Sequence, residues 1–322
     1  MNILADKQQK IFEEGISEEE REVRQQEFYD LYYETLKKDE NGFLGTLSLK
    51  TRRKLHKFVL LVFCCKNWLS GFKCKVIKDE RERTERPIIF ALTHVGKFDI
   101  EVSAVGIKEH FYLLSGDYEH LQGLVDGMFL LVNGVLYFNE KVKKDRVEIV
   151  DRMINHLKAG GNLMYFPEGT WNLRPELPVL PLYWGIVNIA QKSNAIIVPV
   201  AVEQYGKTFK INIGRNFDMQ TFGSGNLEKS KAIISLRDVL ATLKYEIWES
   251  EPKLERKNIC SDEWDKYINA RLAEWPYFDH DYIEGMIYKP KNVTSPDDAF
   301  AHLETIYPTN ENAFLFNKRL KG

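Results

Sequence analysis

Short apolar runs alternate with amphipathic stretches through the middle of this 322-residue chain. A short apolar run bounded by Pro or Gly is typical of a buried strand, and apolar positions at helical spacing are typical of a helix. Alternation of the two predicts an α/β fold, a mainly parallel sheet flanked by helices. The predicted strands are 88–92, 110–115, 135–139, 162–166, 196–203 and 209–213, and the predicted helices between them are 119–132, 144–159 and 182–193.

Residues with candidate chemistry follow the first of these strands, in the segment Thr93-His94-Val95-Gly96-Lys97-Phe98-Asp99. His94 is expected at the carboxyl end of the strand, where open α/β sheets place their ligands. Asp99 is expected in the first turn of a following helix, and a tight turn at Gly96 would fold its carboxylate back onto the imidazole. A His oriented in this way can act as a general base near neutral pH. The alternative is a buried His paired with a local carboxylate for structural reasons.

A second such segment, Phe166-Pro167-Glu168-Gly169-Thr170, follows the strand 162–166. Pro and Gly predict a bend that presents Glu168 and the amides of Gly169 and Thr170 at the end of the strand. Such a turn can bind hydroxyls of a substrate or stabilise a developing oxyanion. The alternative is a strand-to-loop turn with a solvated Glu.

Together the two segments resemble the first and third signature blocks of the glycerolipid acyltransferases, the family that includes the lysophosphatidic acid acyltransferases. Residues 134–140 occupy the place of the second block and 197–201 match the fourth, so the resemblance covers roughly residues 85 to 217. It implies transfer of an acyl group from a thioester, either acyl-CoA or an acylated carrier protein, to an acceptor hydroxyl. His94 would be the base and Asp99 its orienting partner. No metal and no tightly bound cofactor are expected, because a thioester is already activated.

Three places depart from the pattern of family members that act on phosphorylated acceptors. Those members usually carry an Arg closing the second block, an Arg after the Thr of the third, and a Lys pair downstream, whereas this chain has Glu140, Trp171 and Tyr183-Trp184. Arg clamps a phosphate with paired hydrogen bonds and a Glu repels it. We therefore expect a hydroxylated acceptor that lacks a terminal phosphate, such as a glycolipid. The alternative is that other cations supply the phosphate contact; the candidates are Lys97, Lys141, Lys143, Arg146 and Arg174.

The expected site combines catalytic and binding residues. His94 and Asp99 are the catalytic pair. Two other classes of function remain open, a hydrolase that uses water on the same base and a lipid-binding protein without activity. The expected substrate-binding residues are Gly96, Lys97, Asn139, Glu140, Glu168, Gly169, Thr170, Trp171 and Arg174.

Composition bears on the partners and the cellular location of the protein. The formal charge of −2 gives no indication of a nucleic-acid partner, and four Cys without metal-ligand spacing favour a reducing, cytoplasmic location. The apolar run 58–65 is too short to span a bilayer, but it is flanked by cations and followed by Trp68 and Phe72. We expect this stretch to rest on an anionic membrane surface at the inner face of the membrane. The alternative is an ordinary amphipathic core helix.

Both ends of the chain are charged and predict helical extensions, with a helix at 17–38 and two more near 235–249 and 262–273. The aromatic cluster 275–282 holds His280 between two acids, but this lacks the ligand count of a metal site and predicts a surface turn packed by its own rings. Three regions follow: a helical N-terminal arm with a membrane-contacting segment (1–84), an acyltransferase catalytic core (85–222) and a mainly helical C-terminal extension (223–322).

Overall fold

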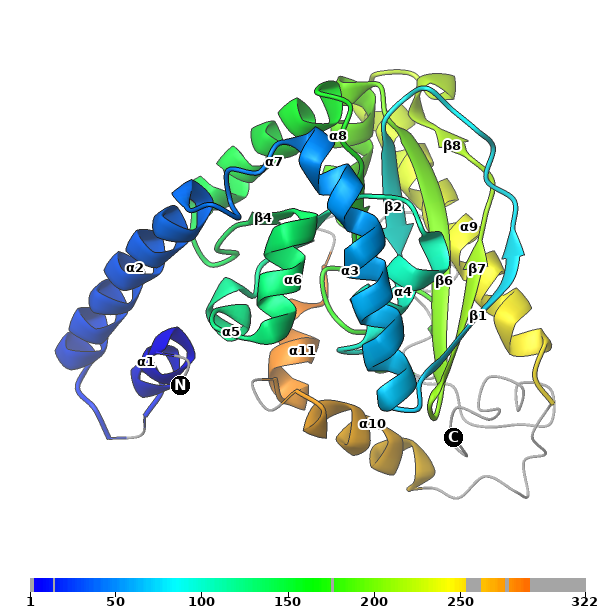
Figure 1. The fold of residues 1–322 in the computed structure, drawn as a ribbon. Helices are drawn as coiled ribbons and strands as arrows, with labels where there is room; N and C mark the ends of the chain where they lie inside the picture. Colours follow the sequence, from blue (N-terminus) through cyan, green and yellow to red (C-terminus); the bar gives the residue numbers. More distant parts are fainter. Residues whose placement is uncertain (1–2, 14, 175–176, 253–261, 276–277, 290–322) are drawn as a thin grey trace. The chain divides into compact units, whose positions relative to one another are not determined.

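The computed structural model describes residues 3–13, 15–174, 177–252, 262–275 and 278–289 (Figure 1). The chain divides into two compact units, the first formed by residues 1–61 and 110–153 and the second by residues 62–109 and 154–322. Two helices, α3 (Leu49–Leu69) and α7 (Lys143–Lys158), run from one unit into the other.

The second unit is built on a sheet in the strand order β1-β7-β6-β2-β5, with β8 paired to β6. β2 lies parallel to both β5 and β6, and β1 lies parallel to β7, whereas β6 pairs with β7 and β8 in antiparallel fashion. The strands predicted at 88–92, 196–203 and 209–213 are all present. The bounds are β1 (Lys73–Asp79), β2 (Ile88–Leu92), β5 (Leu163–Tyr165), β6 (Ile196–Tyr205), β7 (Thr208–Ile213) and β8 (Phe217–Asp218).

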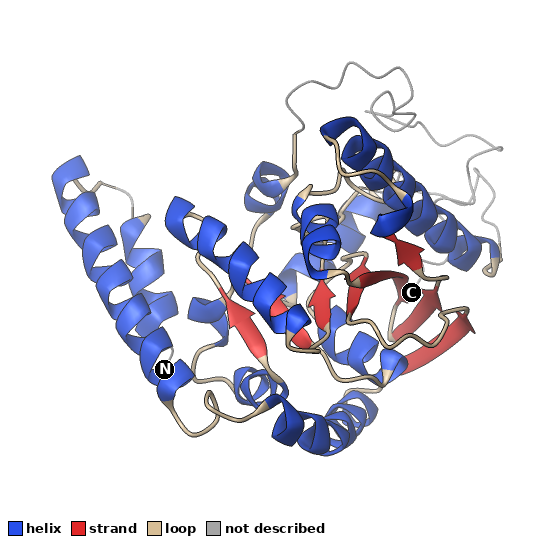
Figure 2. Ribbon diagram, turned by 90° about the horizontal axis from the view of Figure 1, so that it is seen from above, coloured by secondary structure: helices blue, strands red, loops and turns tan. Residues whose placement is uncertain are grey.

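Helices cover both faces of this sheet (Figures 1 and 2). Neighbouring residues of β7 point to opposite faces. Ile211 lies against Gly106 of α4, while the amide of Asn212 donates to the carbonyl of Leu243 in α9. Residues of β6 and α9 share one buried apolar cluster that includes Trp248. The helices of this unit are α4 (Asp99–Ile107), α8 (Gly185–Ser193), α9 (Asn226–Glu249), α10 (Glu263–Ala273) and α11 (His280–Met286), with a 3₁₀ turn at Met219–Thr221.

The first unit joins the N-terminal helices to residues 110–153. Its core cluster brings Phe28, Tyr32 and Leu36 of α2 together with Tyr118 and Tyr137. The side chain of Ser17 caps α2 by accepting from the amide of Glu20. The elements are α1 (Ile3–Ile11), α2 (Glu18–Asn41), β3 (Tyr112–Ser115), α5 (Tyr118–Leu121), α6 (Val125–Asn133) and β4 (Val135–Tyr137), with β3 and β4 paired in parallel.

The structure differs from the sequence-based description at three points. The units do not follow the predicted regions 1–84, 85–222 and 223–322, because aromatic residues of 110–153 pack with the N-terminal helices. The helix expected at 119–132 is two shorter helices with a break at 122–124. Residues 73–79, expected within the helical arm, form β1, where every second or third residue is a Lys and no continuous apolar run marks the strand.

Candidate active site

The sheet order of the second unit brings the two predicted motifs together. β2 and β5 are parallel neighbours, so their carboxyl ends lie at the same edge of the sheet. His94 follows β2 and Glu168 follows β5. The backbone amide of His94 donates to Glu168 Oε1 at 3.0 Å, and the amide of Asn172 donates to the carbonyl of His94 at 2.8 Å. The two motifs therefore meet at the rim of the sheet.

Asp99, the first residue of α4, is fully buried and organises the loop that carries His94. Its Oδ2 lies 2.9 Å from Nδ1 of His94 and accepts from the amides of Val95 at 2.6 Å and Gly96 at 3.0 Å. Because this carboxylate oxygen can only accept hydrogen bonds, we assign the hydrogen between it and His94 to Nδ1. That tautomer leaves the lone pair on Nε2, the atom a general base uses.

The turn between His94 and Asp99 does not depend on glycine for its backbone conformation. Gly96 is not among the residues with positive φ, and a methyl group added there would be 3.9 Å from the nearest atom, an ordinary contact. The expectation that Gly96 permits the turn by conformational freedom is therefore wrong. The three hydrogen bonds to Asp99 hold the loop instead.

Aromatic rings enclose the imidazole of His94. Its ring stacks on Phe166 with centroids 4.1 Å apart, and it meets Trp171 edge-on at 6.0 Å. The His94 side chain is 17% exposed, so only a small part of it faces solvent. Packing on both sides fixes the orientation of the ring, which a base needs in order to meet a substrate hydroxyl at a defined position.

Glu168 differs from the sequence-based expectation of an exposed or substrate-facing carboxylate. The residue is fully buried, and its second oxygen accepts from the amide of Leu180 at 2.7 Å. Burial raises the pKa of Glu168, opposed by the positive charge of Lys244 and by the two amide donors. In this structure its carboxylate connects the His94 loop to the segment at Leu180, which is a positioning role.

Gly169 has the one backbone position in this site that requires glycine. Its φ is 74°, in the left-handed region, and a Cβ would lie 2.4 Å from the ring of Tyr183. Its amide donates to the carbonyl of Phe166 at 3.1 Å, so the turn already uses the hydrogen that was expected to support an oxyanion. Thr170 is buried beside it.

Comparison with known proteins identifies the domain that holds this site. A family model described as Acyltransferase matches residues 73–203, which contain His94, Asp99 and Glu168. This part of the chain is therefore similar to the acyltransferases.

The relatives are distant. An uncharacterized acyltransferase of Schizosaccharomyces pombe is 21% identical over 144 residues, 44% of this chain and 50% of that protein. A 1-acyl-sn-glycerol-3-phosphate acyltransferase of Saccharomyces cerevisiae is 27% identical over 77 residues, 24% of this chain and 25% of that protein. The chain thus spans half or less of the length of these curated relatives. The crystal structure of the 1-acyl-sn-glycerophosphate acyltransferase PlsC from Thermotoga maritima shares the fold, with a TM-score of 0.50 and 18% identity over 68% of this chain and 88% of that one.

Other predicted residues of the candidate site have partners of their own. The guanidinium of Arg174 pairs with Glu284 of α11 at 2.6 Å. The ammonium of Lys97 lies 4.9 Å from the ring centre of Trp275. Asn139 and Glu140 belong to the first unit, where the side chain of Asn139 accepts from the amide of Lys141 at 3.0 Å.

The candidate site also receives residues that the sequence did not indicate. Trp275 is buried, and Phe278 packs edge-on against Trp171 with ring centres 5.5 Å apart. The cluster 275–282 is thus more than a surface turn, although its Pro276 and Tyr277 lie outside the described residues. Arg271 of α10 lies close to Gly96. A separation of about 180 positions along the chain leaves no local pattern that could have linked these residues to His94.

Proposed function

We propose that this protein is an O-acyltransferase that moves a fatty acyl group from an acyl thioester to a hydroxyl of a lipid acceptor. The observation that carries the proposal is the pairing of Nδ1 of His94 with the buried carboxylate of Asp99, at the rim of a sheet of this family. The pair resembles the base half of a catalytic triad, with the nucleophile supplied by the substrate.

The reaction proceeds through a tetrahedral intermediate. Nε2 of His94 takes the proton of the acceptor hydroxyl while its oxygen attacks the thioester carbonyl, and the carboxylate of Asp99 stabilises the imidazolium. When the intermediate collapses, the carbon–sulfur bond breaks and the leaving thiolate takes the proton back from His94. The products are an ester and a free thiol, and either acyl-CoA or an acylated carrier protein fits this scheme.

The contacts in the site lead us to propose a different acceptor from the one expected from the sequence. The expectation of an acceptor without phosphate rested on Glu140, Trp171 and Tyr183 replacing cations. In the structure Trp171 packs against His94 and Phe278, and the hydroxyl of Tyr183 donates to the carbonyl of Met286, so both rings contact protein. The relatives from Saccharomyces cerevisiae and Thermotoga maritima are acyltransferases of acyl-glycerol-phosphate acceptors. A lysophosphatidic acid is therefore the acceptor we propose.

The test is acyl transfer by purified protein from a labelled acyl thioester, with and without lysophosphatidic acid. We expect product that depends on the acceptor, and His94→Ala should lower the rate by about a hundredfold to ten thousandfold while the protein stays folded. Free fatty acid formed without acceptor would indicate a hydrolase. Retention of the thioester without turnover would indicate a lipid-binding protein. A His94→Ala variant with near wild-type transfer would falsify the assignment of the base.

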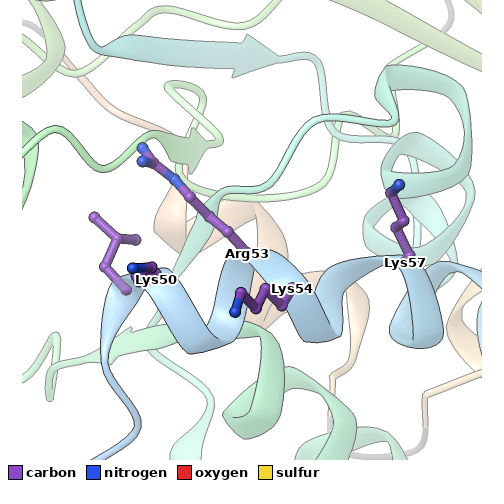
Figure 3. A pocket seen from close by; sticks show the side chains of 5 residues that line it. Lys50, Arg53, Lys54 and Lys57 are labelled. Carbon is purple, nitrogen blue, oxygen red and sulfur yellow. The ribbon is translucent and has the colours of Figure 1, made fainter.

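We also propose that α3 carries the protein to a membrane surface. No helix among the described residues is long and apolar enough to span a bilayer. One face of α3 is buried, including Arg52, Val59 and Phe63. The opposite face exposes large apolar side chains, and its first turns line an open hollow with cations (Figure 3). The exposed apolar residues are Phe58, Leu61, Trp68 and Leu69, and the cations are Lys50, Arg53, Lys54 and Lys57.

This arrangement suits an interfacial helix, because apolar side chains enter the lipid and cations contact anionic headgroups. Sedimentation with anionic vesicles measures it. A Phe58→Ser/Trp68→Ser variant should lose most of its vesicle binding, while Leu227→Ser, at a residue of α9 that is 63% exposed, should bind as the wild type does. Equal binding by all three proteins would contradict the proposal.

A further inference from the structure

The helix α10 places an arginine against the loop that carries the His94–Asp99 pair. A methyl group at Gly96 would lie 3.9 Å from Cδ of Arg271 and 4.0 Å from the side-chain oxygen of Gln204. The amide of Gly96 in turn donates to the Asp99 oxygen that holds His94. Arg271 is thus next to the catalytic loop, and its side chain is 11% exposed.

The guanidinium of Arg271 has incomplete bonding. Its Nη2 pairs with Glu274 at 2.6 Å, but Nε and Nη1 are buried without a hydrogen-bond partner among the described residues. Buried polar groups in proteins are nearly always paired, and a charged donor is the most costly to leave unpaired. Nε and Nη1 lie on different edges of the guanidinium, and each remains a charged donor for an oxygen of an anion.

Glu274 neutralises this arginine only in part. Burial raises the pKa of Glu274, as does the nearby charge of Asp99, while Arg271 and Lys97 oppose the shift. Its second carboxylate oxygen is buried without a partner among the described residues. The contact to Glu274 uses only Nη2, which leaves Nε and Nη1 of Arg271 available to another anion.

Lys97 adds a second cation on the same loop. Its ammonium lies 4.9 Å from the ring centre of Trp275 and 5.4 Å from that of Phe98. Its charge acts on Glu274, the partner of Arg271. Two cations from elements far apart in the sequence therefore lie on one side of the His94 loop.

Three contacts hold the C-terminal segment in this position. Phe278 packs on Trp171, Glu284 pairs with Arg174, and the carbonyl of Met286 accepts from Tyr183. The three partners lie in the segment that follows β5, just beyond Glu168. Trp171 and Tyr183, two of the aromatic residues at the places of the family's cations, thus contact Phe278 and α11.

We propose that Arg271, assisted by Lys97, binds the phosphate of the acceptor. This proposal rests on the proposed function. Only the few bonds of a glycerol unit separate that phosphate from the hydroxyl that His94 must deprotonate, so its site has to adjoin the His94 loop. Arg271 supplies from the C-terminal extension the cation that the second and third motifs lack at Glu140 and Trp171.

The experiment compares Arg271→Gln and Arg271→Lys with Lys266→Gln, a control on the same helix whose side chain is 72% exposed. Binding of a short-chain lysophosphatidic acid and of the matching monoacylglycerol is measured in a His94→Ala background, so that no turnover is needed. KM for acceptor and for thioester is measured in the active background. Thermal unfolding confirms that each variant is folded.

Arg271→Gln should weaken lysophosphatidic acid binding and raise its KM by about tenfold or more, with the KM for the thioester and monoacylglycerol binding nearly unchanged. Arg271→Lys should recover part of the loss, because it keeps the charge but not the fixed positions of the guanidinium donors. Unchanged lysophosphatidic acid binding in folded Arg271→Gln would overturn the proposal, as would a rise in the KM for the thioester alone. Lysophosphatidic acid binding without any acyl transfer by wild-type protein would instead refute the proposed function.

Discussion

Substitution of Asp99 can separate the charge of this residue from its role in holding the loop. In Asp99→Asn, the amide oxygen can take the place of Oδ2 and accept from His94, Val95 and Gly96 as the carboxylate does. The amide nitrogen then occupies the position of Oδ1, which is buried and has no partner among the described residues. The tautomer of His94 is preserved and the negative charge beside it is lost.

The magnitudes follow from the three hydrogen bonds. The contribution of each hydrogen bond to stability falls from about 1.5–3 kcal/mol for a charged acceptor to about 0.5–1.5 kcal/mol for a neutral one. Removal of the buried charge acts in the opposite direction, because it relieves a desolvation penalty of several kcal/mol. We expect the stability of Asp99→Asn to stay within about 2 kcal/mol of the wild type. Asp99→Ala leaves the two loop amides unpaired, at about 1–3 kcal/mol each, and should be less stable by about 2–5 kcal/mol.

The assays are denaturant unfolding and the kcat of acyl transfer. Asp99→Asn should keep the fold and lose about a hundredfold or more in kcat, since the imidazolium formed during the reaction no longer has a counter-ion. Asp99→Ala should lose both stability and activity. If Asp99→Asn transferred acyl groups within about fivefold of the wild-type rate, the reasoning that assigns Asp99 an electrostatic role would be refuted.

Two further predictions concern the backbone and a buried carboxyl. Gly169→Ala should destabilise the protein by about 1–3 kcal/mol in denaturant unfolding, because φ at Gly169 is 74° and the added Cβ would overlap the ring of Tyr183. Gly96→Ala should have nearly wild-type stability, because φ is not positive there and the added Cβ would make only ordinary contacts. Similar losses of stability in the two variants would contradict this account. Burial raises the pKa of Glu119 to about 7, so the folded state keeps the proton of this carboxyl group to higher pH than the unfolded state does. The resulting contribution to stability is fully present below the unfolded-state pKa near 4.5 and is lost as pH rises through 7. Between pH 4.5 and pH 8, the free energy of unfolding of Glu119→Gln should therefore rise relative to that of the wild type by up to about 3 kcal/mol. Parallel pH–stability curves for the two proteins would refute the assignment.

The parts of the site that could be predicted from sequence depend on local bonds. Asp99 lies five positions from His94, and the amides it binds lie between them, so the whole arrangement is contained in one short segment. The apolar run before His94 predicts its strand because β2 is buried along its full length. β1 was not predicted, because its Lys-rich sequence pairs through the backbone with β7 and has no apolar period.

Glu168 shows where a motif indicates position but not role. The sequence places this residue after β5, and a charged side chain beyond a Pro would ordinarily face water. Its burial depends on two amides from other segments, at His94 and Leu180, which no local pattern reveals. Asp99 and Glu168 are thus both buried carboxylates that bind backbone amides of the His94 loop, one from each signature block.

These two carboxylates also explain why the acceptor contact must come from elsewhere. Both oxygens of Glu168 and one of Asp99 are already occupied by amides or by His94, so the blocks that define the family build a rigid base and leave little of their own polar surface for a substrate. A cation that recognises a phosphate has to reach the loop from a segment outside the blocks. Arg271 is in that position, held by α10 against Gly96, with two of its nitrogens still lacking a partner among the described residues. In this arrangement the core holds His94 rigidly and the C-terminal extension selects the acceptor. The extension could then change its selectivity without disturbing His94.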